Sequence, residues 1–156
     1  MPRFSNRRRV LHRADQMFDL VADVERYPEF VPLCQALKVR QRRKNADDGT
    51  ETIVADMTVS FKLVKETFTS EVTLDREHFK ILVRYLKGPF SNLENRWTFE
   101  AKGEEVCDVG FFIAYEFKSK MLATLMGAMF DAAFGRFSAA FEKRADMVYG
   151  KRVVGP

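Results

Sequence analysis

Histidine and cysteine, on which many metal sites and nucleophilic active sites depend, are scarce in this sequence. It holds two of each in 156 residues, and no cluster of histidine, cysteine and carboxylate residues has the spacing of a metal site. The sequence also contains no GxSxG elbow, no GxGxxG turn and no phosphate-binding P-loop. We therefore expect a protein that is not an enzyme and that carries neither a metal nor a covalently bound cofactor.

Long apolar segments and disulfide frameworks are absent as well. No apolar run reaches the ~18–20 residues of a membrane-spanning helix, and no signal peptide opens the chain. Cys34 and Cys107 lie far apart and outside any CxxC spacing, as is common for buried, unreactive cysteines. These absences predict a cytoplasmic protein whose two cysteines stay reduced.

Phenylalanine and positive charge are abundant by contrast. Fifteen phenylalanines accompany four tyrosines and one tryptophan, which indicates a large apolar interior or a cavity. The net charge is +4, and much of the positive charge lies in two clusters that contain no acidic residue. The first cluster comprises Arg3, Arg7, Arg8, Arg9 and Arg13, and the second comprises Lys38, Arg40, Arg42, Arg43 and Lys44. Such clusters can meet anionic lipid or RNA, or can form solvated strand faces.

Alternation of apolar and polar residues dominates the middle of the chain and predicts strands with one buried face. A first strand and a helix at 14–22 come before it, and the alternating strands are expected at 34–44, 52–61, 64–74, 78–88, 92–101 and 105–117. Short turns between successive strands indicate an antiparallel sheet. We expect a single domain, 1–156, of the α+β class: a curved antiparallel sheet of about seven strands wrapped around a long C-terminal helix, with short helices after the first strand.

The longest helical pattern, residues 119–146, carries apolar residues on more than one side. The stripe expected to pack on the sheet comprises Phe130, Phe134, Phe137 and Phe141, extended by Ala123, Met126 and Val148. The predicted solvent side carries Asp131, Ser138 and Glu142. Met121 and Leu125 lie opposite the stripe, where water is expected. We interpret these two residues as a membrane contact, and a dimer contact or tolerated surface residues are the alternatives.

Five segments resemble the coenzyme Q-binding START-domain family. They are "DVERYPEFVPLC" (23–34), "FKLVKETFTSEV" (61–72), "LKGPFSNLENRWTFE" (86–100), "FFIAYEFKS" (111–119) and "AFEKRADMVYG" (140–150). This family includes mitochondrial coenzyme Q-binding proteins and a bacterial branch known as the ribosome-association toxin, and the wider group is called polyketide cyclase/dehydrase-like. The resemblance covers about residues 3–150. Mitochondrial members carry a presequence, so the resemblance implies that this chain is of bacterial type, without a presequence, or a mature form.

The resemblance implies a START-like helix-grip fold with a hydrophobic cavity between the sheet and the C-terminal helix. It also implies that the cavity binds a polyprenyl quinone such as ubiquinone, in support of respiratory electron transport and quinone biosynthesis. Three motifs of the family are matched: Tyr27, Pro28, Phe30, Val31 and Pro32 would border the entrance, Gly88, Pro89 and Phe90 would form a loop between strands, and Trp97 and Phe99 would face inward. Packing without a ligand is the alternative role of these residues.

Strand alternation and the family motifs together give the predicted ligand-binding residues. The predicted cavity wall comprises Tyr27, Phe30, Val31, Val59, Phe61, Phe68, Val83, Tyr85, Phe90, Trp97, Phe111, Ile113, Tyr115, Met126, Phe130 and Phe134. The predicted membrane contacts are Met121, Leu125, Arg40 and Arg42, which would make the protein a peripheral membrane protein.

Two other functions remain open from the sequence. A ribosome-associating translation inhibitor would use the basic clusters, although the outer strand faces lack the aromatic residues with which sheets usually read RNA bases. A small-molecule cyclase would use polar groups that face inward, and the candidates are Glu66, Ser70, Tyr85, Asn95 and Tyr115. DNA is not an expected partner.

Overall fold

The computed structural model describes residues 2–151. The elements follow the predicted order: β1 (Arg3–Val10), α1 (Ala14–Ala22), the 3-10 helix η1 (Val24–Glu29), β2 (Cys34–Lys44), β3 (Glu51–Phe61), β4 (Val64–Asp75), β5 (Lys80–Lys87), β6 (Phe90–Gly103), β7 (Val106–Phe117) and α2 (Lys120–Tyr149). The strands form one seven-stranded antiparallel sheet in the order β1-β7-β6-β5-β4-β3-β2. No helix of this part of the chain is both long enough and apolar enough to cross a bilayer.

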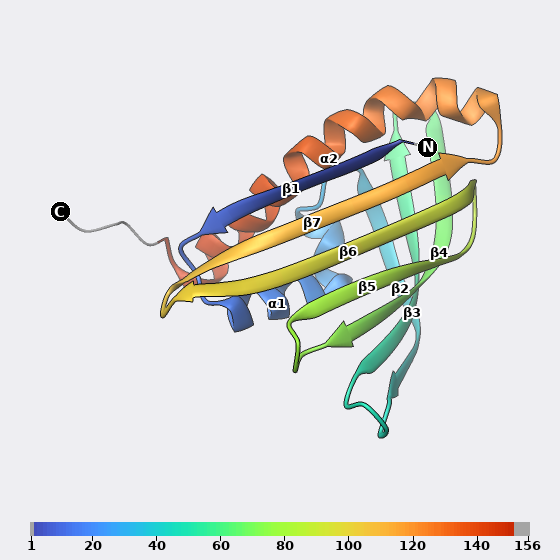
Figure 1. Ribbon diagram of the computed structural model, residues 1–156. Coiled ribbons are helices and arrows are strands. Elements are labelled where there is room, and N and C mark those ends of the chain that lie inside the picture. Colours follow the sequence, from blue (N-terminus) through green and yellow to red (C-terminus); the bar gives the residue numbers. More distant parts are fainter. Residues whose placement is uncertain (1, 152–156) are drawn as a thin grey trace.

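The sheet is bent, and α2 follows one half of it. Figure 1 shows α2 lying along β1 and β7, whereas β2 and β3 run at a steep angle to these strands. Register shifts between Cys34 and Ala36, and between Val39 and Gln41, interrupt the pairing of β2 with β3, and such irregularities increase strand bending. The α+β helix-grip fold predicted from the sequence is therefore confirmed.

Local signals explain where α2 begins and ends. The Ser119 hydroxyl accepts a hydrogen bond from the Leu122 amide at 3.1 Å and so caps the first turn. Gly150 follows the last turn with φ +89°, a backbone conformation that glycine adopts more readily than other residues. The helix thus spans 30 residues between two capping residues, long enough to cover the sheet from end to end.

The buried face of α2 follows the predicted stripe only in its middle. Phe130, Phe134 and Phe141 are buried, and Met126 is fully buried. The predictions for the two ends were wrong, because Ala123 and Val148 are exposed, whereas their neighbours Leu122 and Tyr149 pack against the core there.

Ser138 is a second correction on α2, because it was predicted on the solvent side and is 4% exposed. Its hydroxyl donates a hydrogen bond to the Asn6 side-chain oxygen of β1 at 3.0 Å. A short polar side chain can be buried at low cost when such a partner is present. Glu142 does reach solvent, where it pairs with Arg8 at 2.7 Å.

A buried polar pair holds the C-terminal part of α2. His12 is fully buried after β1, and its Nε2 lies 2.7 Å from Asp146 Oδ1. We expect Asp146→Ala to lower the free energy of unfolding by about 1.5–3 kcal/mol in urea denaturation, since a buried ring nitrogen loses a charged partner. Glu142→Ala, which removes only a more exposed pair, should cost under about 1 kcal/mol. Equal losses in the two variants would contradict a special role for the buried pair.

Candidate functional site

A cavity of about 120 Å³ lies between the sheet, α2 and the segment that joins α1 to β2. Most of the predicted lining residues lie in its wall: Tyr27, Val31, Val59, Phe68, Val83, Phe90, Trp97, Phe111, Ile113, Phe130 and Phe134. The wall also contains apolar residues that share the inward strand register with these, namely Ala55, Met57, Val72, Ile81 and Leu93. Strand alternation therefore accounts for most of the cavity wall.

Several predicted lining residues lie outside the wall. Phe61 is 41% exposed, because the β3–β4 hairpin continues beyond the end of β5 and carries it away from the cavity. Phe30 packs on the outer side of Phe141 at a centroid distance of 5.0 Å, with the Arg144 guanidinium over its ring. Met126 is buried beyond the cavity end of α2.

Two tyrosines of the prediction are also absent from the wall, and their hydroxyls form structural hydrogen bonds. The Tyr85 hydroxyl accepts a hydrogen bond from the Phe90 amide at 3.1 Å. The Tyr115 hydroxyl donates to Asp131 Oδ1 at 2.8 Å and so joins β7 to α2. Asp131 is exposed, as predicted, but it also accepts this bond.

Some residues of the wall were missed by the sequence analysis. Leu33 lies in the turn before β2 with φ +69°, and Leu37 lies in β2 between its two register shifts. Ala133 lies beside the phenylalanine stripe, three residues after Phe130, and is 1% exposed. Its helical spacing is the signal that would have placed it on the cavity side.

The wall is almost entirely apolar, with two polar side chains from the middle of the sheet. The Ser70 side chain is 6% exposed, and its hydroxyl finds no hydrogen-bond partner within residues 2–151. The Asn95 amide donates to the Phe112 carbonyl at 2.8 Å, which leaves its side-chain oxygen as an acceptor. An unpaired buried hydroxyl costs free energy unless a ligand or water satisfies it. The cavity therefore offers a few polar contacts in an otherwise apolar space.

The phenols and thiols of the interior are held in their neutral forms. Burial raises the pKa of Tyr27, whose hydroxyl donates to the Val21 carbonyl. Burial also raises the pKa of the Cys34 and Cys107 thiols to about 11, and both cysteines are free. In the described part of the chain no group of histidine, cysteine and carboxylate side chains could hold a metal ion. The polar groups of the cavity wall can therefore orient a bound ligand through hydrogen bonds.

The two basic clusters have acidic partners from other elements. Arg40 pairs with Asp56, and Arg42 pairs with Glu25 at 2.6 Å and with Glu51 at 3.3 Å. The first cluster is paired in the same way, by Arg8 with Glu142, Arg9 with Asp108 and Arg13 with Asp15. Arg40 and Arg42 are therefore neutralised in space, which makes them weak candidates for membrane contact, whereas Lys38, Arg43 and Lys44 form no ion pair with the described residues.

Comparisons with known proteins agree with this architecture. The family model described as "polyketide cyclase / dehydrase and lipid transport" matches residues 10–142. The ribosome association toxin RatA of Escherichia coli is 32% identical over 152 residues, which cover 97% of this chain and 92% of the relative. The mitochondrial coenzyme Q-binding protein COQ10 homolog B of Xenopus laevis is 32% identical, over 90% of this chain and 56% of the relative.

A solved structure extends the comparison to the fold. The 18 kDa protein CC1736 of Caulobacter crescentus is 34% identical, covers 96% of this chain and 99% of its own, and superposes with a TM-score of 0.78. Both the sequence match and the superposition include the strands and the helix that build the cavity. The chain therefore belongs to the polyketide cyclase/dehydrase and lipid transport family, in the START-like group that includes the RatA and COQ10 proteins.

Proposed function

We propose that this protein binds an apolar ligand with an oxygen-bearing ring, of the polyprenyl quinone class, and carries it without chemical change. The observation that supports this most directly is the unpaired Ser70 hydroxyl in an apolar cavity. A pure hydrocarbon would leave this hydroxyl unsatisfied, whereas a quinone carbonyl can accept its hydrogen bond. The Asn95 oxygen would suit the hydroxyl of a reduced, quinol form.

The size of the cavity limits what is bound inside it. A dry cavity of about 150 Å³ in another protein takes up one benzene molecule, so about 120 Å³ here suits a single ring. A polyprenyl tail needs more space than this. We propose that the ring occupies the interior and that the tail follows the gap between the α1–β2 segment and α2, where Val31, Leu33 and Phe137 form apolar walls.

The proposal is tested by extraction of the purified protein under native conditions, followed by mass spectrometry of the bound lipid. A polyprenyl quinone in near-equimolar amount would support it. Recovery of phospholipid or fatty acid alone, together with failure to bind added ubiquinone, would reject the quinone assignment and leave a different apolar ligand.

Removal of the Ser70 hydroxyl should have opposite effects on stability and on binding. We expect Ser70→Ala to raise the stability of the ligand-free protein by about 1 kcal/mol, because a buried unpaired hydroxyl is lost. The same variant should bind quinone about 3–10-fold more weakly, because the ligand loses one hydrogen bond. Thermal unfolding and tryptophan fluorescence titration measure the two effects. Ser5→Ala, which alters an exposed hydroxyl of β1 that forms no hydrogen bond within residues 2–151, is the matched control and should change neither quantity.

A second candidate function is association with the ribosome. The relatives named for it match over nearly their whole length, whereas the COQ10 homolog matches over 56% of its own, so the comparisons favour this function over quinone binding. Co-sedimentation of the protein with ribosomes in a sucrose gradient tests it directly. Binding that persists after the cavity is blocked would make the ribosome the principal partner, while binding that depends on the cavity ligand would join the two functions.

Catalysis by the cavity is the least supported alternative. It would need an acid or base beside a bound substrate, and the side chains of the wall that can hydrogen-bond are Ser70, Asn95, Trp97 and the neutral Tyr27. These side chains are the reason for proposing a carrier rather than an enzyme. Its place at the cytoplasmic face of a membrane remains a prediction.

A further inference from the structure

One end of the sheet gathers lysines that form no ion pairs with the described residues. Because the sheet is antiparallel, the β3–β4 turn, the β5–β6 turn and the β7–α2 connection all lie at the same end. We call this end, formed by residues 61–66, 86–90 and 116–121, the basic end. It holds Lys62, Lys65, Lys87, Lys118 and Lys120, and its acids are Glu66 and Glu116. All five lysines are exposed, and none of them forms an ion pair with any residue that the structure describes.

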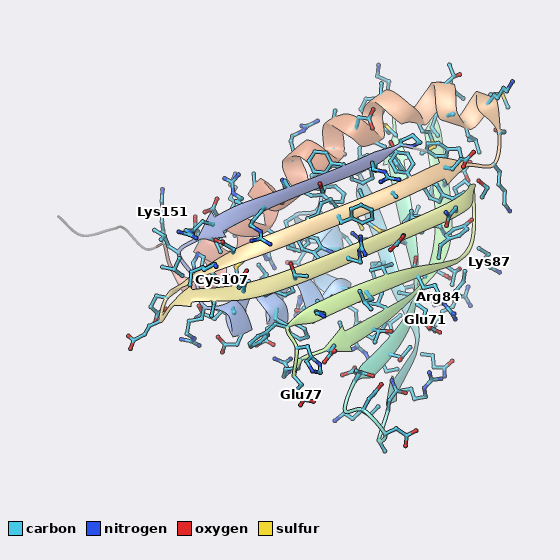
Figure 2. All side chains as sticks on the ribbon, in the orientation of Figure 1. Glu71, Glu77, Arg84, Lys87, Cys107 and Lys151 are labelled. Atoms are coloured by element: carbon cyan, nitrogen blue, oxygen red, sulfur yellow. The ribbon has the colours of Figure 1, made fainter. Side chains whose placement is uncertain are left out.

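The opposite end has a different charge. Its turns, residues 45–50, 75–80 and 102–106, contain six acids and three lysine or arginine residues. Figure 2 shows the contrast along β5, with Lys87 at one end of the strand and Glu77 beyond the other. The turns at the two ends of the sheet are therefore oppositely charged, and Lys44 of β2 is a positive residue beside the acidic turns. An anionic partner would be attracted to the basic end and repelled by the other.

Large apolar side chains accompany the lysines at the basic end. Leu63, at the tip of the β3–β4 turn, is 101% exposed, and Phe61 beside it is 41% exposed. Lys62 occupies the turn with φ +54°, and its ammonium lies 5.3 Å from the centre of the Phe61 ring. Met121 and Leu125, in the first turns of α2, are 69% and 56% exposed. Nothing within residues 2–151 covers these side chains.

The basic end also adjoins the cavity. Ring contacts join Phe68 of β4 to Phe90 at 5.5 Å and Phe90 to Phe130 of α2 at 5.9 Å, and all three rings lie in the cavity wall. The Ser60 amide donates to the Leu33 carbonyl at 3.0 Å, so the wall residue Leu33 is tied to β3 directly before Phe61. A surface that docks on the basic end would therefore lie close to the ligand.

We propose that the basic end is the docking surface for an anionic phospholipid bilayer. The lysines would lie among the headgroup phosphates, while Leu63, Phe61 and Met121 would enter the boundary of the acyl chains. Ribosomal RNA would also attract the lysines, but phosphate contacts give no reason for a fully exposed leucine at the tip of a turn. This inference extends the proposed function by naming the partner surface, and it does not depend on the ligand being a quinone.

Quinone-free vesicles test the docking surface separately from ligand binding. The purified protein is floated with vesicles of phosphatidylglycerol and phosphatidylcholine, and with vesicles of phosphatidylcholine alone. We expect binding to the anionic vesicles only, and K62E/K65E should weaken it by about 30-fold or more, since each lysine at such a surface contributes about fivefold. Leu63→Glu should weaken it by about 10-fold or more, because the leucine no longer enters the bilayer.

Matched controls separate the basic end from net charge and from exposed leucines in general. K44E/K80E makes the same charge change at the other end of the sheet, and Leu82→Glu alters a half-exposed leucine on the outer face of β5. Both controls should bind anionic vesicles within about threefold of the wild type. Equal weakening by K44E/K80E, or wild-type binding by both K62E/K65E and Leu63→Glu, would overturn the proposal. Wild-type protein that binds ribosomes through Lys62 and Lys65 but does not bind anionic vesicles would also overturn it and assign the surface to RNA.

Discussion

An Ala133→Phe variant is expected to fold and to lose quinone binding by about 100-fold or more. Ala133 is 1% exposed and lines the cavity from α2, so a phenyl ring at this position would occupy the space of about 120 Å³ that the ligand ring needs. Burial of one ligand ring contributes about 3 kcal/mol to the binding free energy, and losing it weakens binding by about 100-fold or more. Fluorescence titration with ubiquinone and native mass spectrometry measure the loss.

Ala132→Phe is the control for this prediction, because Ala132 is the exposed neighbour on the same helix. It should bind the ligand as the wild type does. The thermal unfolding of Ala133→Phe should shift only modestly, since filling a cavity offsets part of the 1–3 kcal/mol that overpacking costs. A folded Ala133→Phe protein that retains wild-type quinone affinity would show that the ligand binds elsewhere.

The same variant, tested in ribosome gradients, decides whether the ribosome is bound independently of the cavity.

Phe90→Ala is expected to have the largest effect on stability, with a loss of about 3–5 kcal/mol in the free energy of unfolding. Phe90 is 1% exposed and its ring contacts five others: Phe68, Tyr85, Tyr115, Phe117 and Phe130. These rings come from β4, β5, β7 and α2, so the loss of one ring loosens the attachment of the helix to the sheet. Urea denaturation followed by far-ultraviolet circular dichroism measures it.

The backbone before Phe90 determines where its ring lies. Gly88 has φ +146°, and a Cβ atom there would lie 2.6 Å from Phe68 Cβ, so the turn must cross β4 at close range. Pro89 then directs Phe90 inward at the start of β6. Phe112→Ala is the matched control, because its ring lies on the outer face under Arg96 and should cost under about 1.5 kcal/mol. Similar costs for the two variants would contradict the central position of Phe90.

The faces of the strands and the fold class could be predicted from the sequence. Alternation in β4, β6 and β7 places Val72, Trp97 and Phe111 inward, and the structure has them buried. Side chains of an extended backbone alternate between the two faces of the sheet, and this alternation within a strand does not depend on how the strand pairs with its neighbours. The same holds for the stripe of α2 around Phe130 and Phe134, because helical spacing fixes which residues share a face.

The tertiary structure alone decided where these faces end and which charges meet. Phe61 continues the inward alternation of β3 but is exposed, because the lengths of β3 and β4 carry it beyond the sheet that would cover it. Arg42 stands in an acid-free segment and is paired with Glu25 from η1, whereas Lys62 and Lys120, far apart in the chain, share an end of the sheet without acidic partners. The unpaired hydroxyl of Ser70 likewise appears only once the neighbouring strands are in place. Periodicity acts over a few residues, but charge pairing, hydrogen-bond satisfaction and exposure depend on distances in space, which the register and bending of the whole sheet determine.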